Sequence, residues 1–299
     1  MNAERRTPNV GRRSLVGAVL LERVRVGSAL RGREVTVLGD GVVNLFHRDL
    51  GGAGRPPLVI LHGLLGSSRN WQTAGRDLGA QYHVSALDLR NHGQSPHAAE
   101  MSYEAMVADV LGWLDAHGLG KVTLLGHSLG GKVAMALACR HPDRVDHLVV
   151  VDIAPRDYQA AAHRTELAAM AAIDLGRLPS RAAAEQALES AVPDWAMRKF
   201  LVTNLETVAP GQWRWQANLP VLAQSLAALE ANPLRAGERF DGPTTFIVGG
   251  KSGYVRAEDR AFIHDYFPAV RLETIAGAGH NPHIETREEF VALVAAARS

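Results

Sequence analysis

A serine between two glycines stands at residue 128, where a segment typical of a strand runs straight into one typical of a helix. Gly126-His127-Ser128-Leu129-Gly130 fits the pattern G-x-S-x-G, with VTLL before it and KVAMALACR after it. At such a strained strand-to-helix turn, residues without side chains let two backbone segments approach closely and leave the serine hydroxyl exposed. The N-terminus of the next helix directs free N–H groups at developing negative charge. We therefore predict Ser128 as a nucleophile; the alternative is an idle serine at a glycine-rich junction.

A serine nucleophile needs a base, and on a parallel sheet with this junction the order along the chain is nucleophile, acid, histidine. Thirteen histidines occur, so position has to choose among them. Gly277-Ala278-Gly279-His280 follows the last expected strand, and its small residues form a loop that presents one imidazole. A neutral imidazole accepts the serine proton near neutral pH. We predict His280 as the base, with His283 as a weaker alternative.

The acid that orients the histidine has two candidate positions. The strand after the expected insertion ends in Gly249-Gly250-Lys251-Ser252, with no carboxylate before Glu258. The strand before the insertion ends in Val151-Asp152, whose aspartate lies at the carboxyl edge of the sheet, where sites assemble. We predict that Asp152 orients His280 and stabilises its charged form, with Glu258 or Asp259 as the alternative acid. Asp152 could instead cap the turn at Ala154-Pro155.

The negative charge of a tetrahedral intermediate requires two N–H donors. One comes from the residue after the nucleophile, Leu129, and the other from a loop after an earlier strand. Leu61-His62-Gly63-Leu64 is that loop, and we predict the backbone N–H of Leu64 as the second donor. We interpret His62 as a structural histidine that holds this loop.

Substrate-binding residues are predicted less directly. Trp213 and Trp215 lie in a helical insertion and form either its core or an apolar wall for an acyl chain. With Leu65 and Tyr254 they make up the predicted substrate pocket. The segment from Asp88 to Ser95 follows a strand, and we expect Asp88, Arg90 and Ser95 to fix a loop by hydrogen bonds.

These residues must be positioned by an α/β fold, because buried apolar runs alternate with helical patterns along the chain. Strands are expected at 42–48, 57–63, 83–90, 121–128, 147–155, 243–250 and 271–277, with helices at 103–117, 130–140, 257–267 and 288–297. Residues 156–235 break the alternation with helical spacing and no convincing strand. We predict a mostly parallel central sheet with helices on both faces, a core of residues 36–155 and 236–299, and a helical cap at 156–235.

Composition excludes several classes of function. The 299 residues carry a formal net charge of +1, which does not favour nucleic acid as a partner, and no apolar run could span a bilayer. Cys139 is the single cysteine, which excludes an internal disulfide and fits a reducing compartment. No phosphate-binding glycine motif or metal-ligand spacing occurs, so we expect neither cofactor nor metal.

The first 35 residues have a different character. Eight arginines and two glutamates occupy residues 1–33, and we expect a disordered basic extension there. Arg12-Arg13 followed by SLVGAVLL weakly resembles a twin-arginine export signal, but the apolar stretch is short and no small-residue cleavage site follows. A cytoplasmic location is therefore expected, while the oligomeric state is not predicted.

Six segments together resemble a known family: HGLLGSSRNW, DLRNHGQSP, GHSLGGKVAM, VVVDIAP, WRWQANL and AGAGHNPH. From about Val42 onward the chain is similar to the YbfF-type bacterial esterases and their mitochondrial relative, α/β-hydrolase domain protein eleven. The resemblance implies the α/β-hydrolase fold and hydrolysis of short acyl esters and acyl thioesters without a cofactor. It also places Ser128, Asp152 and His280 on the catalytic triad of that family.

Three functions are consistent with the sequence. The first is an esterase or thioesterase that acts through an acyl-serine on a small acyl ester or acyl thioester. The second keeps the fold but cleaves carbon–carbon bonds or catalyses a menaquinone-pathway-type elimination. It would need a clamp for acidic substrates, which Arg156, Arg164 and Arg214 could supply. The third is a ligand-binding protein on a hydrolase scaffold without catalysis.

Overall fold

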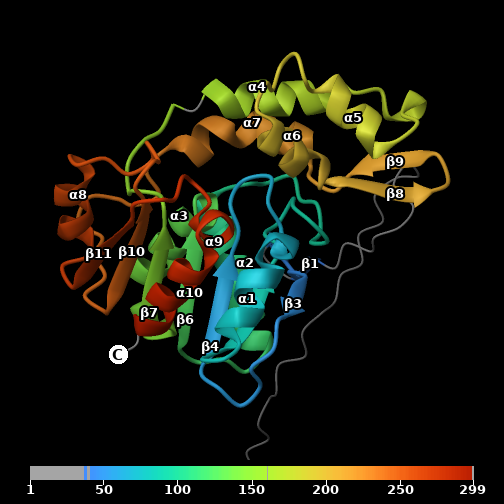
Figure 1. The fold of residues 1–299 in the computed structure, drawn as a ribbon. Coiled ribbons are helices and arrows are strands. Elements are labelled where there is room, and N and C mark those ends of the chain that lie inside the picture. Colours follow the sequence, from blue (N-terminus) through green and yellow to red (C-terminus); the bar gives the residue numbers. More distant parts are fainter. Residues whose placement is uncertain (1–36, 39–40, 160, 298–299) are drawn as a thin grey trace, which may run out of the picture.

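A central β-sheet organises the molecule (Figure 1). The computed structural model describes residues 37–38, 41–159 and 161–297, so the expected basic extension lies outside the described residues. Seven strands follow the order β11-β10-β7-β6-β4-β5-β3, with β3 antiparallel to β5 and all other neighbours parallel. In that order they are β11 (Val270–Ile275), β10 (Thr244–Gly249), β7 (Val145–Val151), β6 (Val122–His127), β4 (Pro57–Leu61), β5 (His83–Leu87) and β3 (His47–Asp49).

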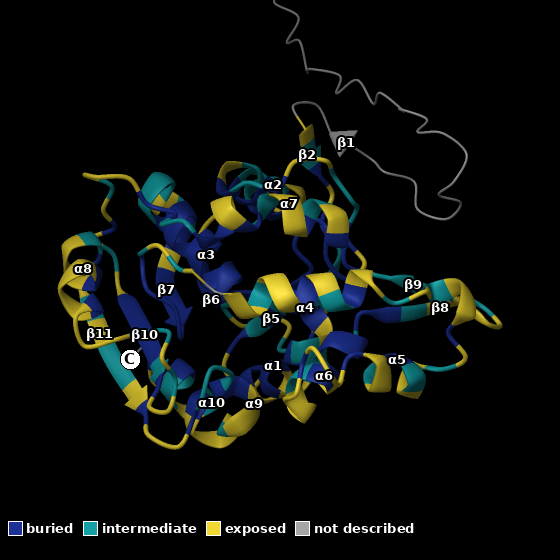
Figure 2. Ribbon diagram, turned by 90° about the horizontal axis from the view of Figure 1, so that it is seen from above, coloured by how far each residue is buried: buried dark blue, intermediate teal, exposed yellow. Residues whose placement is uncertain are grey.

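Helices cover both faces of this sheet. One face carries α1 (Gln72–Leu78) and α10 (Arg287–Ala296), and the other carries α2 (Tyr103–Ala116), α3 (Leu129–Arg140) and α8 (Asp259–Tyr266) (Figure 2). Short helices connect these elements: η2 (Ser68–Trp71), η3 (Pro142–Arg144) and α9 (Pro282–Glu285). Among the helices of the described residues, none has the length and apolar character needed to cross a bilayer.

Strand β4 illustrates why the sheet is covered twice. Leu58 and Ile60 belong to the apolar core under α1 and α10, whereas Val59 and Leu61 belong to the core under α2 and α3. Successive side chains of a strand point to opposite faces, so a run of apolar residues needs packing on both sides. The doubly covered, mostly parallel sheet expected from the sequence is therefore confirmed.

Above the sheet lies a cap (Figure 1). It consists of α4 (Ala161–Ala171), η4 (Leu175–Arg177), α5 (Arg181–Ala187), α6 (Trp195–Val202), β8 (Leu205–Ala209), β9 (Gln212–Trp215) and α7 (Leu219–Glu230). The hairpin β8–β9 corrects the expectation that residues 156–235 contain no strand. Its signal is the Pro210-Gly211 turn, where Gly211 has φ +72°, flanked by short runs rich in β-branched and aromatic residues.

The first expected strand is interrupted. Residues 42–48 form not one strand but β2 (Val42–Val43), which pairs with β1 (Val37–Leu38), and the beginning of β3. The N–H of Val43 donates to Asp109 Oδ1 at 2.8 Å, and the N–H of Phe46 donates to Ser95 Oγ at 2.9 Å. Side-chain oxygens therefore accept hydrogen bonds from backbone N–H groups that, in a continuous strand, would bind a neighbouring strand.

Candidate active site

Ser128 occupies the sharp turn between β6 and α3. Its φ is 52° and its ψ is −118°, a left-handed conformation that is rare outside glycine. Its N–H donates to the carbonyl of Val151 on the neighbouring strand at 3.1 Å. A Cβ at Gly126 would lie 2.2 Å from the carbonyl oxygen of Gly130, and one at Gly130 would lie 2.3 Å from that of Leu61. The glycines flanking the serine are therefore needed for close backbone contacts.

Asp152 and His280, which are 128 residues apart in the sequence, meet directly. Nδ1 of His280 lies 2.7 Å from Oδ2 of Asp152. The carboxylate is fully buried and also accepts hydrogen bonds from the N–H of Gly249, at 2.9 Å, and from the hydroxyl of Ser252. Because the carboxylate can only accept, Nδ1 carries the proton and Nε2 of His280 is left as the basic nitrogen.

The alternative residues for the acid and the base have other partners. Asp259 is buried in an ion pair with Arg156, at 3.0 Å, and accepts the N–H of Arg256. Glu258 is exposed and lies 3.7 Å from Arg256. His283 is buried with its ring stacked on Trp71 at 4.0 Å, and burial lowers its pKa to about 3. None of these contacts resembles the pairing of Asp152 with His280.

The loop after β4 faces the Ser128 turn. A Cβ at Gly63 would lie 3.2 Å from that of Ser128, so the two segments are in contact. Within the described part of the chain, the N–H groups of Leu64 and Leu129 have no hydrogen-bond acceptor. The first N–H groups of a helix lack internal partners, which accounts for Leu129, the first residue of α3. The two predicted donors are therefore available to an oxyanion.

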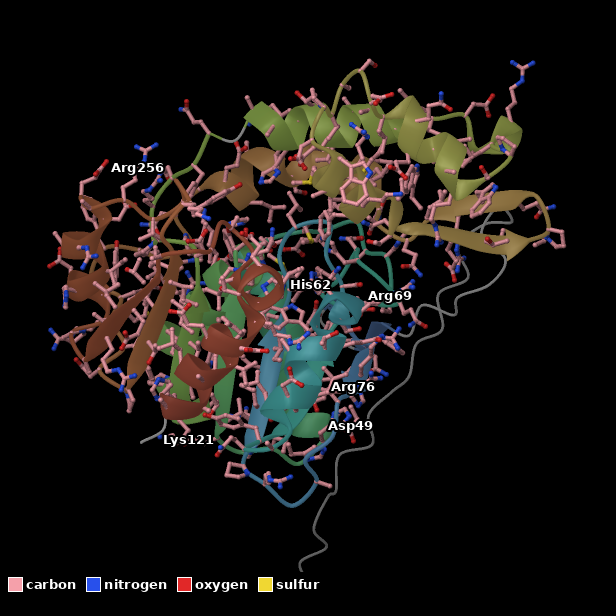
Figure 3. The ribbon with its side chains drawn as sticks, in the orientation of Figure 1. Asp49, His62, Arg69, Arg76, Lys121 and Arg256 are labelled. Carbon is pink, nitrogen blue, oxygen red and sulfur yellow. The ribbon has the colours of Figure 1, made fainter. Side chains whose placement is uncertain are left out.

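His62 links this loop to two others, at the end of the sheet that faces the cap (Figure 3). Its Nδ1 lies 2.8 Å from the carbonyl oxygen of Gly63, and its Nε2 accepts the N–H of Leu89 at 3.0 Å. Its own carbonyl accepts the N–H of Gly130 at 3.1 Å. Burial lowers the pKa of His62 to about 4, so the ring is neutral near pH 7 and donates from Nδ1. These bonds fit the structural role expected for His62.

The loop from Asp88 to Ser95 is fixed by buried hydrogen bonds, as expected. Asp88 accepts the N–H groups of Ser68 and Gln94 at 2.6 and 2.7 Å, and Ser95 Oγ donates to the Asp88 carbonyl. Arg90 forms a fully buried ion pair with Asp109 at 2.6 Å. This network holds η2 and the Gly63 loop in place beneath the cap.

A small cavity of about 40 Å³ opens beside Ser128, between the sheet and the cap. Its walls are mostly apolar, with a few polar side chains. Among the described residues the lining consists of Leu64, Ser128, Leu129, Lys132, Ile153, Tyr158, His163, Leu226, Leu229, Glu230 and Tyr254. A cavity of this size holds about three water molecules.

The predicted pocket needs correction at three of its four positions. Tyr254 lines the cavity, but Leu65, Trp213 and Trp215 are not part of its lining in the described structure. Trp213 donates its Nε1–H to the carbonyl of Leu178 inside the cap, at 2.9 Å, and Leu65 is buried in the apolar core. The hairpin β8–β9, which the sequence did not predict, directs both tryptophans into the packing of the cap. They therefore fit the alternative interpretation, in which they form the core of the cap.

Tyr254 connects the cavity to the histidine. Its ring stacks on that of His280 with centroids 3.8 Å apart and planes 15° apart. His127, next to the nucleophile, binds the carbonyl of His280 through Nε2 at 2.8 Å. Among the described residues no hydrogen bond joins the Ser128 hydroxyl to the His280 ring. Such bonds are often long before substrate binds.

The site also contains residues beyond those predicted from the sequence. Ser252 binds Asp152, His127 binds His280, and Lys132 and Leu229 line the cavity. Lys132 has a signal in the sequence, because it stands four residues after Ser128 and so on the same face of the following helix. The other three contacts join segments that are far apart in the sequence, and no local pattern indicates them.

Comparisons with known proteins show which family this chain resembles. Residues 56–286 match the sequence profile of a family described as alpha/beta hydrolase fold. The sn-1-specific diacylglycerol lipase ABHD11 of Mus musculus is 39% identical over 251 residues, which cover 82% of this chain and 81% of that protein. Esterase YbfF of Escherichia coli is 38% identical over 232 residues, covering 77% and 87%. A solved structure described as a marine microorganism esterase has a TM-score of 0.81 at 34% identity and covers 84% of this chain and 98% of its own.

The chain therefore belongs to the α/β-hydrolase family. Within that family it falls into the group that contains ABHD11 and the YbfF esterase, as the sequence motifs indicated. It is a hydrolase of the esterase and lipase kind.

Proposed function

We propose that this protein hydrolyses short, uncharged carboxylic esters or acyl thioesters through an acyl-enzyme on Ser128. In this proposal His280 is the general base, Asp152 orients it, and the N–H groups of Leu64 and Leu129 bind the oxyanion. The observation that carries the proposal is the 2.7 Å contact between His280 Nδ1 and a buried Asp152 that also accepts hydrogen bonds from Gly249 and Ser252. That arrangement leaves Nε2 as the only basic nitrogen of His280.

The first half of the reaction forms the acyl-enzyme. Oγ of Ser128 attacks the carbonyl carbon of the ester while its proton moves to Nε2 of His280. The carbonyl oxygen becomes an oxyanion held by the N–H groups of Leu64 and Leu129, while Asp152 stabilises the imidazolium. When the intermediate collapses, the bond to the leaving oxygen or sulfur breaks and the His280 proton passes to that atom.

The second half releases the acid. Water attacks the acyl-serine carbonyl and gives its proton to Nε2 of His280, and the same two N–H groups hold the second oxyanion. Collapse breaks the bond to Oγ of Ser128, which recovers the proton from His280. Both halves use the same groups, so no further reactant than water is required.

The cavity supports a short, uncharged acyl group. Leu64, Leu129, Ile153, Leu226 and Leu229 give it apolar walls. The charged side chains on its rim have protein partners: Glu230 pairs with Arg164 at 2.6 Å, and His163 lies 3.0 Å from Glu166.

The reaction on acidic substrates has less support. Each arginine considered for a clamp is bound to a carboxylate: Arg156 to Asp259, Arg164 to Glu230 and Arg214 to Glu206, at 3.0, 2.6 and 2.8 Å. A substrate carboxylate would have to displace one of these partners. We therefore favour ester or thioester hydrolysis over carbon–carbon cleavage or elimination.

The test compares p-nitrophenyl acetate hydrolysis by the wild type, Ser128→Ala and the exposed control Ser190→Ala. We expect Ser128→Ala to lose roughly 10⁶-fold in kcat, as for removal of a triad serine elsewhere, and the control to retain activity. A fluorophosphonate probe should label the wild type and the control but not Ser128→Ala.

Equal hydrolysis by wild type and Ser128→Ala would refute an acyl-serine. A folded wild type that neither hydrolyses the ester nor reacts with the probe would favour a binding protein. Phenyl acetate and S-phenyl thioacetate, which share one acyl group, then distinguish ester from thioester preference.

A further inference from the structure

Lys132 is buried beside the candidate nucleophile, yet its ammonium group is directed at the cap. It stands on α3, four residues after Ser128, and is 2% exposed. Its Nζ donates to the carbonyl oxygens of Glu230 and Ala231 at 2.8 and 2.7 Å, and lies 3.4 Å from that of Leu229. Burial lowers the pKa of Lys132 to about 7, and the three carbonyls can accept every N–H that the amino group offers, two when neutral or three when protonated. Lys132 therefore binds the backbone at residues 229–231 and has no donor left for a substrate.

The carbonyls that Lys132 binds end helix α7. The last carbonyls of a helix lack internal partners and carry partial negative charge, which a buried cation stabilises. Two further donors reach the same end, one from the core and one from the segment between β7 and α4. The hydroxyl of Tyr103, on α2, donates to the Leu229 carbonyl at 2.5 Å, and the N–H of Tyr158 donates to that of Glu230 at 2.8 Å. Three residues thus bind the end of α7, and two of them, Lys132 and Tyr103, stand on helices of the core.

Helix α7 supplies the wall of the cavity opposite the serine turn. Leu226 and Leu229 are three residues apart, on one face of the helix, and both line the cavity together with Ser128 and Leu129. Because Lys132 stands on α3, the helix that directly follows Ser128, its contact with α7 sets the spacing between the nucleophile and this apolar wall.

We propose that Lys132 is a specificity-determining residue, which limits the acyl group to short chains by fixing the end of α7 over Ser128. The proposal rests on the proposed esterase function and names the element that sets its acyl-chain limit. Lys132 lines the cavity, but its donors bind the end of α7 and not the reacting atoms, so it acts here through position. Release of the end of α7 lets Leu226 and Leu229 move away from Ser128 and lengthens the cavity.

The test measures kcat/KM of the full chain for p-nitrophenyl acetate, butyrate, hexanoate and octanoate. Lys132→Met keeps the length of the side chain and removes its donors. We expect the ratio of octanoate to acetate kcat/KM to rise about tenfold, the effect of burying roughly two more methylene groups. Tyr103→Phe removes a second donor to the same carbonyls and should shift the ratio in the same direction by less.

Lys199→Met is the matched control, because Lys199 lies in the cap but pairs with Glu185 and does not touch the end of α7. It should keep the wild-type ratio. Circular dichroism shows whether Lys132→Met and Tyr103→Phe are folded. If both are folded but their kcat/KM values for all four esters fall by one common factor, Lys132 is merely structural and the proposal is overturned. If Lys132→Met does not fold, the ratio for Tyr103→Phe decides alone. A wild type inactive on every ester would instead refute the esterase function itself.

Discussion

The carbonyl oxygen of His62 accepts the backbone N–H of Gly130 at 3.1 Å, which joins the loop after β4 to the first turn of α3. One of these segments carries Leu64 and the other carries Leu129. A single backbone hydrogen bond therefore sets the separation of the two N–H groups that we assign to the oxyanion.

Gly130→Ala tests that spacing. An added Cβ would lie 2.3 Å from the carbonyl oxygen of Leu61 and 2.6 Å from that of His62, so the two segments must separate. We expect kcat for p-nitrophenyl acetate to fall roughly 10²- to 10³-fold, as when one oxyanion donor is lost. Gly120→Ala, at a glycine without a positive φ and with nothing within 4 Å of its added Cβ, controls for the loss of a glycine. If folded Gly130→Ala keeps the wild-type kcat, the separation of the Leu64 and Leu129 N–H groups does not control the rate.

The acid assignment is tested by two matched amide substitutions. Asp152→Asn keeps the shape but favours the wrong tautomer of His280, and we expect kcat to fall by roughly 10⁴. Asp259→Asn alters a carboxylate that pairs with Arg156 instead, so its kcat should stay close to that of the wild type. The measurement is kcat corrected for the fraction of each variant that a fluorophosphonate labels. The reverse ranking of the two variants would move the acid to Asp259.

Ser252 should matter because its hydroxyl and the ring of His280 share one oxygen of Asp152. Loss of a hydrogen bond to a charged group costs about 1.5–3 kcal/mol, so Ser252→Ala should lower kcat by roughly 10- to 100-fold. KM should change little, since Ser252 does not line the cavity beside Ser128 in the described structure. Ser252→Thr retains the hydroxyl and should recover most of the lost rate. A change confined to KM would argue against positioning through Asp152.

Acid should destabilise this protein through its buried histidines. Burial lowers the pKa of His62 to about 4 and the pKa values of His92 and His283 to about 3. Below pH 6.5 these histidines bind protons in the unfolded chain but stay neutral in the folded state. The free energy of unfolding therefore falls as the pH falls. Each such histidine adds up to about 1.4 kcal/mol per pH unit to this loss.

His283→Phe isolates one of these contributions. The ring of His283 stacks on Trp71, and its Nδ1 has no hydrogen-bond partner among the described residues, so phenylalanine fits its surroundings. Urea unfolding between pH 7 and pH 4.5 should show a shallower loss of stability for His283→Phe than for the wild type. His264→Gln changes an exposed histidine and should keep the wild-type slope. Equal slopes for wild type and His283→Phe would contradict the lowered pKa.

The local parts of this architecture could be predicted from the sequence. Glycines within a few residues of Ser128 indicate the turn, and continuous apolar runs indicate the buried strands. The α/β-hydrolase fold predicted on these grounds is confirmed. The choice of Asp152 over Glu258 used the order of strands in the sheet, and the structure does bring Asp152 to His280. Their catalytic roles stay predictions until the variants are measured.

The packing inside the cap could not be predicted in the same way. Whether Trp213 faces a substrate or the interior depends on the hairpin β8–β9 and on the position of Leu178, thirty-five residues away in sequence. The contact between Lys132 and the end of α7 spans 98 residues, and its donors satisfy backbone carbonyls, which no side-chain pattern reveals. Packing between distant segments decided both outcomes.

Two neighbouring strands, β6 and β7, are followed by residues in left-handed conformations, with φ of 52° at Ser128 and 50° at Asp152. Each such residue costs of order 1 kcal/mol or more, which the rest of the fold must offset. The protein therefore trades thermal stability for reactivity at these two positions. Ser128→Gly, which relieves the strain and removes the hydroxyl, should melt at a higher temperature than the wild type while hydrolysing nothing.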